Sequence, residues 1–318
     1  MGDPGRVFSH QRPYRRCTPK CSSVESLIVD GAKKTAFLLE TSLLSAAVFL
    51  GTNPVAVKYA VGGIPPLPFV ALRFTLAGLL VLVFLRLWGQ GGGLRRKDLL
   101  PMAALGLIGV GVNNVLFTFG VDLTSASNTA LIYATPPLWG MLLGFALGQE
   151  RPKVRGAIGV VLALLGVGVI VYGGLGASLA GDLLVAGAAV CWGSYTAFST
   201  LLLRRYSPLV VAAYTMFVAG LGVIPLASFD LVRTDWGTVG LDVWAALAYS
   251  TLFVAAFGFA AWQGGISRIG ANRVLVYQYL IVLTGVASGV VFFGENLGAN
   301  KLLGGAIILV GVYLARRQ

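Results

Sequence analysis

Residues 154–174 read VRGAIGVVLALLGVGVIVYGG, and their single charged side chain, that of Arg155, lies near the start. An apolar helix of about 20 residues is long enough to cross the hydrocarbon core of a bilayer. The long apolar run does not alternate with polar residues, which excludes the strand pattern of a membrane barrel. The stretch therefore predicts a transmembrane helix, and similar stretches recur along the chain.

The composition places the whole chain in the membrane class. Of its 318 residues, 57% are hydrophobic and only 11% are charged, and the mean hydropathy is +0.82. The 43 glycines suit transmembrane helices, which pack closely through small residues. We predict an all-α membrane protein with ten transmembrane helices, at 36–59, 68–88, 99–120, 126–147, 154–174, 181–203, 208–229, 242–264, 272–293 and 300–316.

The Lys and Arg residues predict the orientation, because cytoplasmic loops retain positive charge. If the N-terminus is inside, every one of the 24 Lys and Arg residues falls on the inside except Lys58, Arg73, Arg233 and Lys301. Both termini are therefore expected in the cytoplasm, with the protein in the cytoplasmic membrane. The net charge of +12 is spread over short clusters between apolar runs, so no nucleic acid is expected as a partner.

Residues 1–35 are polar and basic and lack the apolar core of a signal peptide. They predict a disordered basic cytoplasmic tail, unless translation starts further downstream. Cys17, Cys21 and His10 lie in this tail without a fourth metal ligand. We expect neither a metal nor a cofactor.

An internal repeat divides the chain into two halves, 36–174 and 181–316. Two sets of matches carry the repeat: Phe49–Thr52 with Cys191–Ser194 and Ala77–Leu79 with Ala219–Leu221 at an offset of 142, and Glu150, Gly159 and Gly166 with Glu295, Gly304 and Gly311 at an offset of 145. Five spans per half is an odd number, so the second half is expected to run through the bilayer in the opposite direction. Inverted repeats place a substrate site between the halves near the midplane.

Several of these segments resemble the drug/metabolite transporter superfamily, and specifically its EamA-type members. The resemblance is carried by Gly-Thr-Asn-Pro at 51–54, Ala-Leu-Arg-Phe at 71–74, Thr-Ser-Ala-Ser-Asn at 124–128, Leu-Gly-Gln-Glu-Arg-Pro at 147–152 and Trp-Gly-Ser at 192–194. Phe-Leu-Gly at 49–51 departs from the Trp-Gly that is usual in such families. The resemblance implies a ten-span permease that exports amino acids, other small metabolites or drugs.

Charged residues inside a bilayer are functional candidates, because they are costly to bury. Arg73 and Lys58 are expected near the external side, where they would form a positive mouth for anionic or zwitterionic substrates. The alternative is that Lys58 extends to the headgroups and Arg73 bonds to helix-end carbonyls. No carboxylate is expected at the midplane, which favours facilitated diffusion or exchange over proton coupling.

Neutral polar and aromatic side chains at mid-span complete the predicted binding site. The candidate substrate-binding residues are Asn53, Arg73, Asn113, Asn114, Tyr133, Trp192, Ser194, Tyr195, Tyr214, Trp262, Tyr277 and Gln278. Pro54 removes a backbone donor from the first span, so Gly51 and Pro54 are predicted as a hinge beside the cavity, with Lys58 as its rim. The competing interpretation is that these side chains bond between helices or anchor the helices at the interface.

The sequence thus predicts a transporter of small molecules and not an enzyme, since neither a nucleophile with its base nor a metal cluster is present. Two alternatives stay open: a sugar-phosphate or nucleotide-sugar exchanger, which needs cations along its cavity, and a membrane scaffold or sensor that acts through its basic tail. The sequence leaves monomer and homodimer open.

Overall fold

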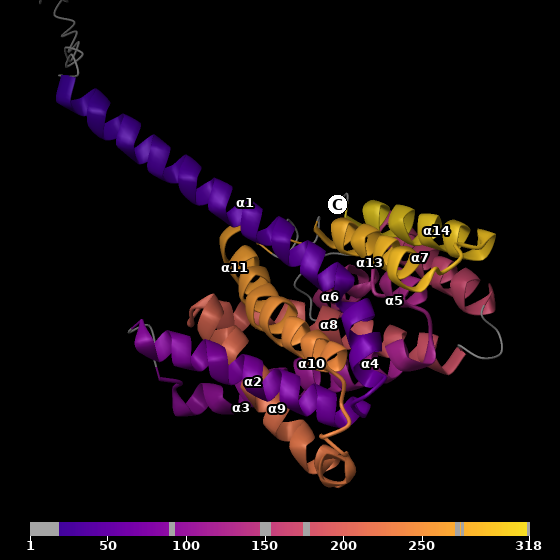
Figure 1. Cartoon of the computed structure of the whole chain (residues 1–318). Coiled ribbons are helices and arrows are strands. Elements are labelled where there is room, and N and C mark those ends of the chain that lie inside the picture. The colour runs from indigo at the N-terminus through magenta and orange to yellow at the C-terminus, as the bar shows by residue number, and fades with distance from the viewer. Residues whose placement is uncertain are drawn as a thin grey trace, which may run out of the picture. The chain divides into compact units, whose positions relative to one another are not determined.

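The computed structural model describes residues 19–88, 93–146, 154–173, 179–270, 274 and 277–316, and within these ranges it contains helices and no strands. The all-helical prediction is therefore confirmed. In chain order the helices are α1 (Pro19–Val61), α2 (Pro66–Leu87), α3 (Arg96–Ala104), the π-helical η1 (Leu105–Val112), α4 (Asn113–Leu123), α5 (Ala126–Ile132), α6 (Pro136–Ala146), α7 (Val154–Gly173), α8 (Leu179–Leu203), α9 (Pro208–Arg233), α10 (Leu241–Tyr249), the π-helical η2 (Ser250–Gly258), α11 (Phe259–Ile269), α13 (Tyr277–Phe293) and α14 (Ala299–Arg316) (Figure 1).

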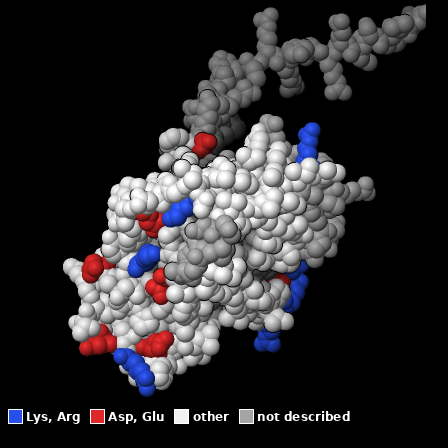
Figure 2. Space-filling model, turned by 90° about the vertical axis from the view of Figure 1, so that its right-hand side faces the viewer, with Lys and Arg blue, Asp and Glu red and all other residues white. Residues whose placement is uncertain are grey.

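Many of these helices are suited to a lipid environment. Six helical stretches of the described chain are long and apolar enough to cross a bilayer, and three more apolar helices are shorter: Val154–Ile170, Tyr277–Phe293 and Ala299–Leu314. Large apolar side chains, among them Leu87, Leu226 and Val291, are exposed on the outside. Figure 2 shows few charged side chains on the described surface that it presents. The protein spans a membrane several times.

The chain divides at Glu40 into two units, one up to Glu40 and one from Thr41 to Gln318. Residues 19–35, which were expected to be disordered, belong to helix α1. Pro19 suits the first helical position, where a backbone N–H has no partner within the helix. Residues 1–18, with Cys17 and His10, lie outside the described residues.

The span expected at 126–147 is broken into α5 and α6. Pro136 and Pro137 explain the break, because neither has a backbone N–H and Pro136 disfavours the α conformation at Thr135. The residues between the two helices, Tyr133 to Thr135, form a turn. The motif at 147–152, with Glu150, lies outside the described residues.

Two long helical stretches are widened by π-helical segments. The stretch from Arg96 to Leu123 consists of α3, η1 and α4, and the stretch from Leu241 to Ile269 consists of α10, η2 and α11. η1 begins at Leu105 and η2 at Ser250, which are 145 residues apart. π-Helical turns are rare and are frequent at functional sites.

Two helix pairs pack through glycines in a reciprocal pattern. In the α7–α14 pair, a methyl group added at Gly166 would lie 2.7 Å from the carbonyl oxygen of Gly304, and one at Gly311 would lie 2.7 Å from that of Gly159. In the α2–α9 pair, Gly78 lies against the backbone of Phe217, and Gly220 lies against that of Thr75. Each contact thus recurs with the roles of the two helices exchanged.

Candidate functional site

A cavity lies where α1, α2, α4 and the end of α5 meet α8, η2, α11 and α13. Ten of the residues predicted from the sequence line it: Gly51, Asn53, Pro54, Arg73, Asn113, Asn114, Tyr133, Trp192, Trp262 and Gln278. Five predicted residues do not line it: Lys58, Ser194, Tyr195, Tyr214 and Tyr277.

The cavity is small. The space open to the centres of water molecules is about 40 Å³, which suits a few waters, since one water needs roughly 10–15 Å³ by this measure. A few waters take up less space than most amino acids, so binding of a substrate of that size requires the side chains or helices of the wall to move.

Arg73 of α2 is a buried cation in the cavity wall and does not form the exposed mouth that the sequence predicted. It is 1% exposed, and its Nε donates a hydrogen bond to the carbonyl oxygen of Ser250 at 3.3 Å. Its guanidinium carbon lies 4.9 Å from the centroid of the Phe74 ring and 5.8 Å from that of Phe69. Its Nη1 is buried without a hydrogen-bond partner. The prediction placed Arg73 by its distance from the span end, and packing against the neighbouring helices covers it.

The two neighbouring asparagines of α4 both line the cavity and are linked to each other. Asn114 Nδ2 donates to Asn113 Oδ1 at 3.0 Å and to the carbonyl oxygen of Val110 at 2.9 Å. Asn113 Nδ2 donates to the Tyr133 hydroxyl at 3.0 Å and to the carbonyl oxygen of Ala188. These bonds fix the amide groups and join α4 to α5 and α8.

Aromatic rings form another part of the wall. The Trp192 ring lies 5.0 Å from the Phe259 ring and 6.4 Å from the Trp262 ring, centroid to centroid. Tyr195 lies behind this wall, stacked on Trp192 at 5.2 Å. Its hydroxyl accepts a hydrogen bond from Gln263 Nε2 at 2.6 Å and contacts Thr215 Oγ1 at 3.2 Å. Tyr195 thus supports the wall and does not itself line the cavity.

The other predicted residues outside the lining have different positions. Ser194 Oγ donates to the Val190 carbonyl of its own helix at 2.8 Å. Tyr214 and Tyr277 are partly exposed. α1 continues as a helix through Pro54, and Gly51 packs directly against Thr284 and Ile281 of α13.

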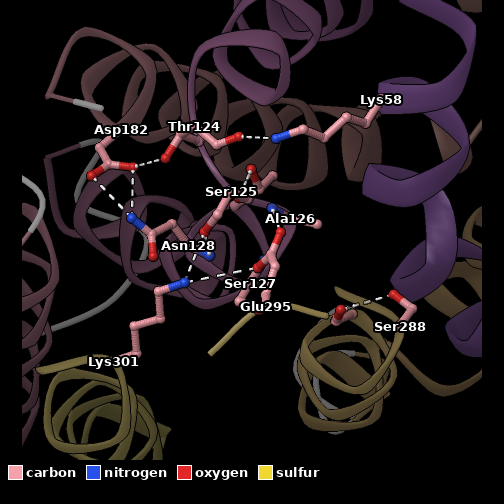
Figure 3. Close-up of polar contacts among 12 residues, drawn as sticks. Lys58, Thr124, Ser125, Ala126, Ser127, Asn128, Asp182, Ser288, Glu295 and Lys301 are labelled. Carbon is pink, nitrogen blue, oxygen red and sulfur yellow. Dashed lines mark hydrogen bonds and ion pairs between the residues drawn. The ribbon is translucent and has the colours of Figure 1, made fainter. Parts of the chain in front are cut away.

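A polar cluster at one end of the helices closes around the start of α5 (Figure 3). This Glu295 cluster consists of Lys58, Thr124, Ser125, Asn128, Asp182, Glu295 and Lys301. Glu295 follows Gly294, whose φ of 61° ends α13 in the left-handed conformation that glycine favours. The Glu295 carboxylate accepts hydrogen bonds from the backbone N–H groups of Ala126 at 2.7 Å and Ser127 at 2.9 Å.

The environment of Glu295 favours its charged form. Partial burial alone would raise its pKa, but the bonds from Ser127 and Ala126 and the charge of Lys301 outweigh it, so the pKa of Glu295 lies below its usual value. Lys301 Nζ lies 3.8 Å from Glu295 Oε2 and donates to Ser125 Oγ at 3.1 Å. α14 and the loop before it are thereby held to the start of α5.

The same cluster holds α1 and α8. Lys58 Nζ donates to the carbonyl oxygen of Thr124 at 2.6 Å, and Thr124 Oγ1 donates to Asp182 Oδ1 at 2.6 Å. Asn128 Nδ2 donates to both carboxylate oxygens of Asp182, at 3.2 and 3.3 Å. Lys58 thus joins α1 to this cluster and does not itself line the cavity.

A second cluster lies at the other end of the stretch from Arg96 to Leu123. This Asp98 cluster consists of Arg95, Asp98, Arg205 and Tyr206. Asp98 accepts from Arg205 Nη1 at 2.8 Å and from the Tyr206 hydroxyl at 2.7 Å, and the Tyr206 oxygen accepts from the backbone N–H of Arg95 at 3.1 Å. The stretch is roughly 40 Å long at 1.5 Å per residue, with Asn113 and Asn114 between its ends. Asn113 and Asn114 of the cavity wall thus lie along this stretch between the two polar clusters.

Sequence reasoning missed the apolar part of the lining: Leu50, Phe117, Ala130, Val254, Phe259 and Ile281. Nothing in an apolar chain distinguishes these residues from those facing lipid. Sequence reasoning also missed the Glu295 and Asp98 clusters, although the polar run 124–128 was visible as an interruption between apolar segments. The pair Pro136–Pro137 was likewise visible as an interruption of the span expected at 126–147.

Comparison with known proteins agrees with this architecture. The sequence profile of the EamA-like transporter family matches residues 38–172 and again residues 179–317. The chain is 27% identical to the uncharacterized transporter YyaM of Bacillus subtilis, over 86% of this chain and 92% of that protein. It is 28% identical to a probable terminal-alkyne amino-acid exporter of Streptantibioticus cattleyicolor, over 70% of this chain and 75% of that protein.

A probable amino-acid metabolite efflux pump of Salmonella typhimurium is 25% identical, over 89% of this chain and 95% of that protein. One solved crystal structure superposes with a TM-score of 0.63 at 19% identity, over 87% of this chain and 97% of that one, which shows a common fold. The two profile matches together span nearly the whole described chain. The chain belongs to the EamA-like transporter family.

Proposed function

We propose that this protein exports small metabolites, amino acids among them, across the cytoplasmic membrane by alternating access. The observation that carries the proposal is the cavity whose wall contains Arg73 and Asn113 from the first half of the chain and Trp192 and Gln278 from the second. A site between two halves can be exposed to either side when the halves rock. Two relatives bear names that refer to export of amino acids or their metabolites.

The halves are two five-helix inverted repeats, 36–174 and 181–316, that supply ten spans. The family profile matches the chain twice. η1 and η2 begin 145 residues apart, and the glycine contacts of the α7–α14 pair exchange roles between the two helices. All three observations support the repeat. Both termini lie in the cytoplasm by the distribution of Lys and Arg.

The two polar clusters are the closures of the transport path. Opening the Glu295 cluster while the Asp98 cluster stays closed exposes the cavity to one side, and the reverse exposes it to the other. Gly51 and Pro54 form the hinge of α1, because Gly51 contacts α13 directly and Pro54 leaves the Leu50 carbonyl without its usual helical donor. Pro54→Ala with unchanged transport kinetics would reject the hinge.

Export is tested with the purified protein in liposomes loaded with an isotopically labelled mixture of the twenty amino acids. Efflux of at least one amino acid above that of protein-free liposomes is expected, with no efflux from the Trp192→Ala variant. Trp244→Ala is the matched control, because Trp244 is an exposed residue of α10 outside the cavity lining. Efflux no faster than from protein-free liposomes would refute amino-acid export.

A further inference from the structure

The cavity lining carries charge of one sign. Among the described residues that line it, Arg73 is the only one with an ionisable charge at neutral pH, and a guanidinium stays protonated in proteins. No Asp or Glu lies among these described lining residues. The wall therefore offers one positive charge and no counter-charge to a molecule in the cavity.

Three polar atoms of lining residues are buried without a hydrogen-bond partner. They are Arg73 Nη1 on α2, Trp262 Nε1 on α11 and Gln278 Oε1 on α13. An unsatisfied buried polar group costs about 1–3 kcal/mol, so three such atoms on residues that line one small cavity need a reason. Two are donors and one is an acceptor, which is the complement of a ligand with an anionic acceptor group and a nearby donor.

The internal contacts of these residues do not account for the three atoms. The carbonyl oxygen of Ser250 accepts a hydrogen bond from Arg73 Nε, and the Phe74 and Phe69 rings lie beside the guanidinium. Gln278 Nε2 donates to the carbonyl oxygen of Tyr133 at 2.9 Å, which orients the amide and leaves Oε1 for another donor. The internal contacts thus position the groups that remain unpartnered.

We propose that the cavity recognises the carboxylate of its substrate, a monoanionic or zwitterionic small acid with an apolar body. Arg73 Nη1 and Trp262 Nε1 donate to the carboxylate, and Gln278 Oε1 accepts from an N–H or O–H group on the adjacent atom. Phe117, Trp192 and Phe259 pack against the apolar part. This inference rests on the proposed export of small metabolites and defines the chemical class that is carried.

The charge of the cavity wall favours monoanionic and zwitterionic acids over phosphorylated substrates and over amines. A phosphate ester or a nucleotide sugar brings about two negative charges, and one guanidinium is available to meet them. An amine without a carboxylate finds no acid in the wall. A single carboxylate matches the single cation.

The experiment compares matched probes on the purified full-length protein in detergent, by ligand-induced shifts of the melting temperature. One set is L-phenylalanine, 3-phenylpropanoate and phenethylamine, and a second is L-leucine, 4-methylpentanoate and 3-methylbutylamine. In at least one set, both carboxylates are expected to bind about tenfold or more tightly than the amine. Binding of the amine as tight as that of the acids, or binding of no probe in either set, would overturn the inference.

Two variants assign the effect to the proposed residues. Arg73→Gln should weaken carboxylate binding by about 30-fold or more, the consequence of removing one partner of a buried charge pair. Trp262→Phe keeps an aromatic ring but loses the N–H group, and should weaken carboxylate binding by about tenfold. This variant still tests the site if Arg73→Gln does not fold. Arg233→Gln is the matched control, because Arg233 is exposed and lies 3.8 Å from the Phe229 ring, outside the cavity lining.

Unchanged carboxylate affinity in both cavity variants would remove Arg73 and Trp262 from the site. The liposome efflux assay keeps the two proposals apart. Carboxylate binding that depends on Arg73, without efflux of any amino acid, supports the site and refutes amino-acid export. Efflux together with equal binding of amines and acids refutes the carboxylate site and leaves export standing.

Discussion

Replacing Glu295 by Gln should loosen the closure at the start of α5. The carboxylate accepts two backbone N–H groups at 2.7 and 2.9 Å, and its side chain is only 11% exposed. A hydrogen bond to a charged group contributes roughly 1.5–3 kcal/mol. Gln keeps one acceptor oxygen and loses the charge and the second bond, so we expect a loss of about 2 kcal/mol. That corresponds to about a 30-fold larger open population.

The opening can be measured as the rate at which a maleimide labels a single cysteine in the cavity. Phe117→Cys places it in the lining, in a background with Cys17, Cys21 and Cys191 replaced. Glu295→Gln should raise the labelling rate in detergent by about 30-fold. Asp122→Asn is the matched control, because it removes an exposed carboxylate from the same end of α4. Equal rates with and without Glu295→Gln would refute the closure.

The same contact should depend on pH in a defined direction. The pKa of Glu295 lies below its ordinary value of 4.5, so the carboxylate stabilises the closed end at neutral pH and loses this effect as the pH falls through the lowered pKa. The ratio of the labelling rates of Glu295→Gln and the wild type should therefore be constant above pH 4.5 and fall towards one below it. Taking the ratio cancels the titration of the thiol itself.

Three further changes test other parts of the structure. Tyr206→Phe removes one hydrogen bond to the buried carboxylate of Asp98, should weaken the other closure by about 1.5–3 kcal/mol, and should speed labelling of the same cavity cysteine; an unchanged rate would argue against that closure. Gly166→Val forces a side chain against the Gly304 carbonyl at 2.7 Å and should lower the yield of monodisperse protein on size-exclusion chromatography, whereas a wild-type profile would contradict the tight packing. Tyr195→Phe should lower the melting temperature slightly, since one net hydrogen bond is worth about 1 kcal/mol, and leave carboxylate affinity unaltered; a large loss of affinity would place Tyr195 in the site.

The membrane class and the approximate positions of several helices follow from the sequence because lipid imposes one simple requirement, an apolar run of sufficient length. The stretch 154–174 satisfies it, and α7 occupies nearly the same residues. The break in the span expected at 126–147 was harder to predict from the sequence, because the apolar residues continue past Tyr133 and only Pro136 and Pro137 interrupt them.

The site was predictable where a polar side chain stands out from an apolar background. Asn53 and Gln278 are such cases, and both line the cavity. The apolar lining, such as Phe259, gives no comparable signal. The repeat set Asn53 opposite Tyr195, but only Asn53 reaches the cavity, because the larger Tyr195 side chain stacks behind Trp192. Two positions that the predicted repeat pairs therefore need not have the same side-chain role.

The wide helical turns of η1 and η2 determine which face of the following helix meets the cavity. Asn113 follows η1 directly, and Trp262 comes shortly after η2. Deleting one residue from either segment would rotate everything after it by about 100° relative to the preceding helix. Asn113 and Asn114 would then turn toward other neighbours without any change in their identity. Single-residue insertions or deletions in η1 or η2 can therefore change which side chains of the following helix face the cavity, without changing any of those side chains.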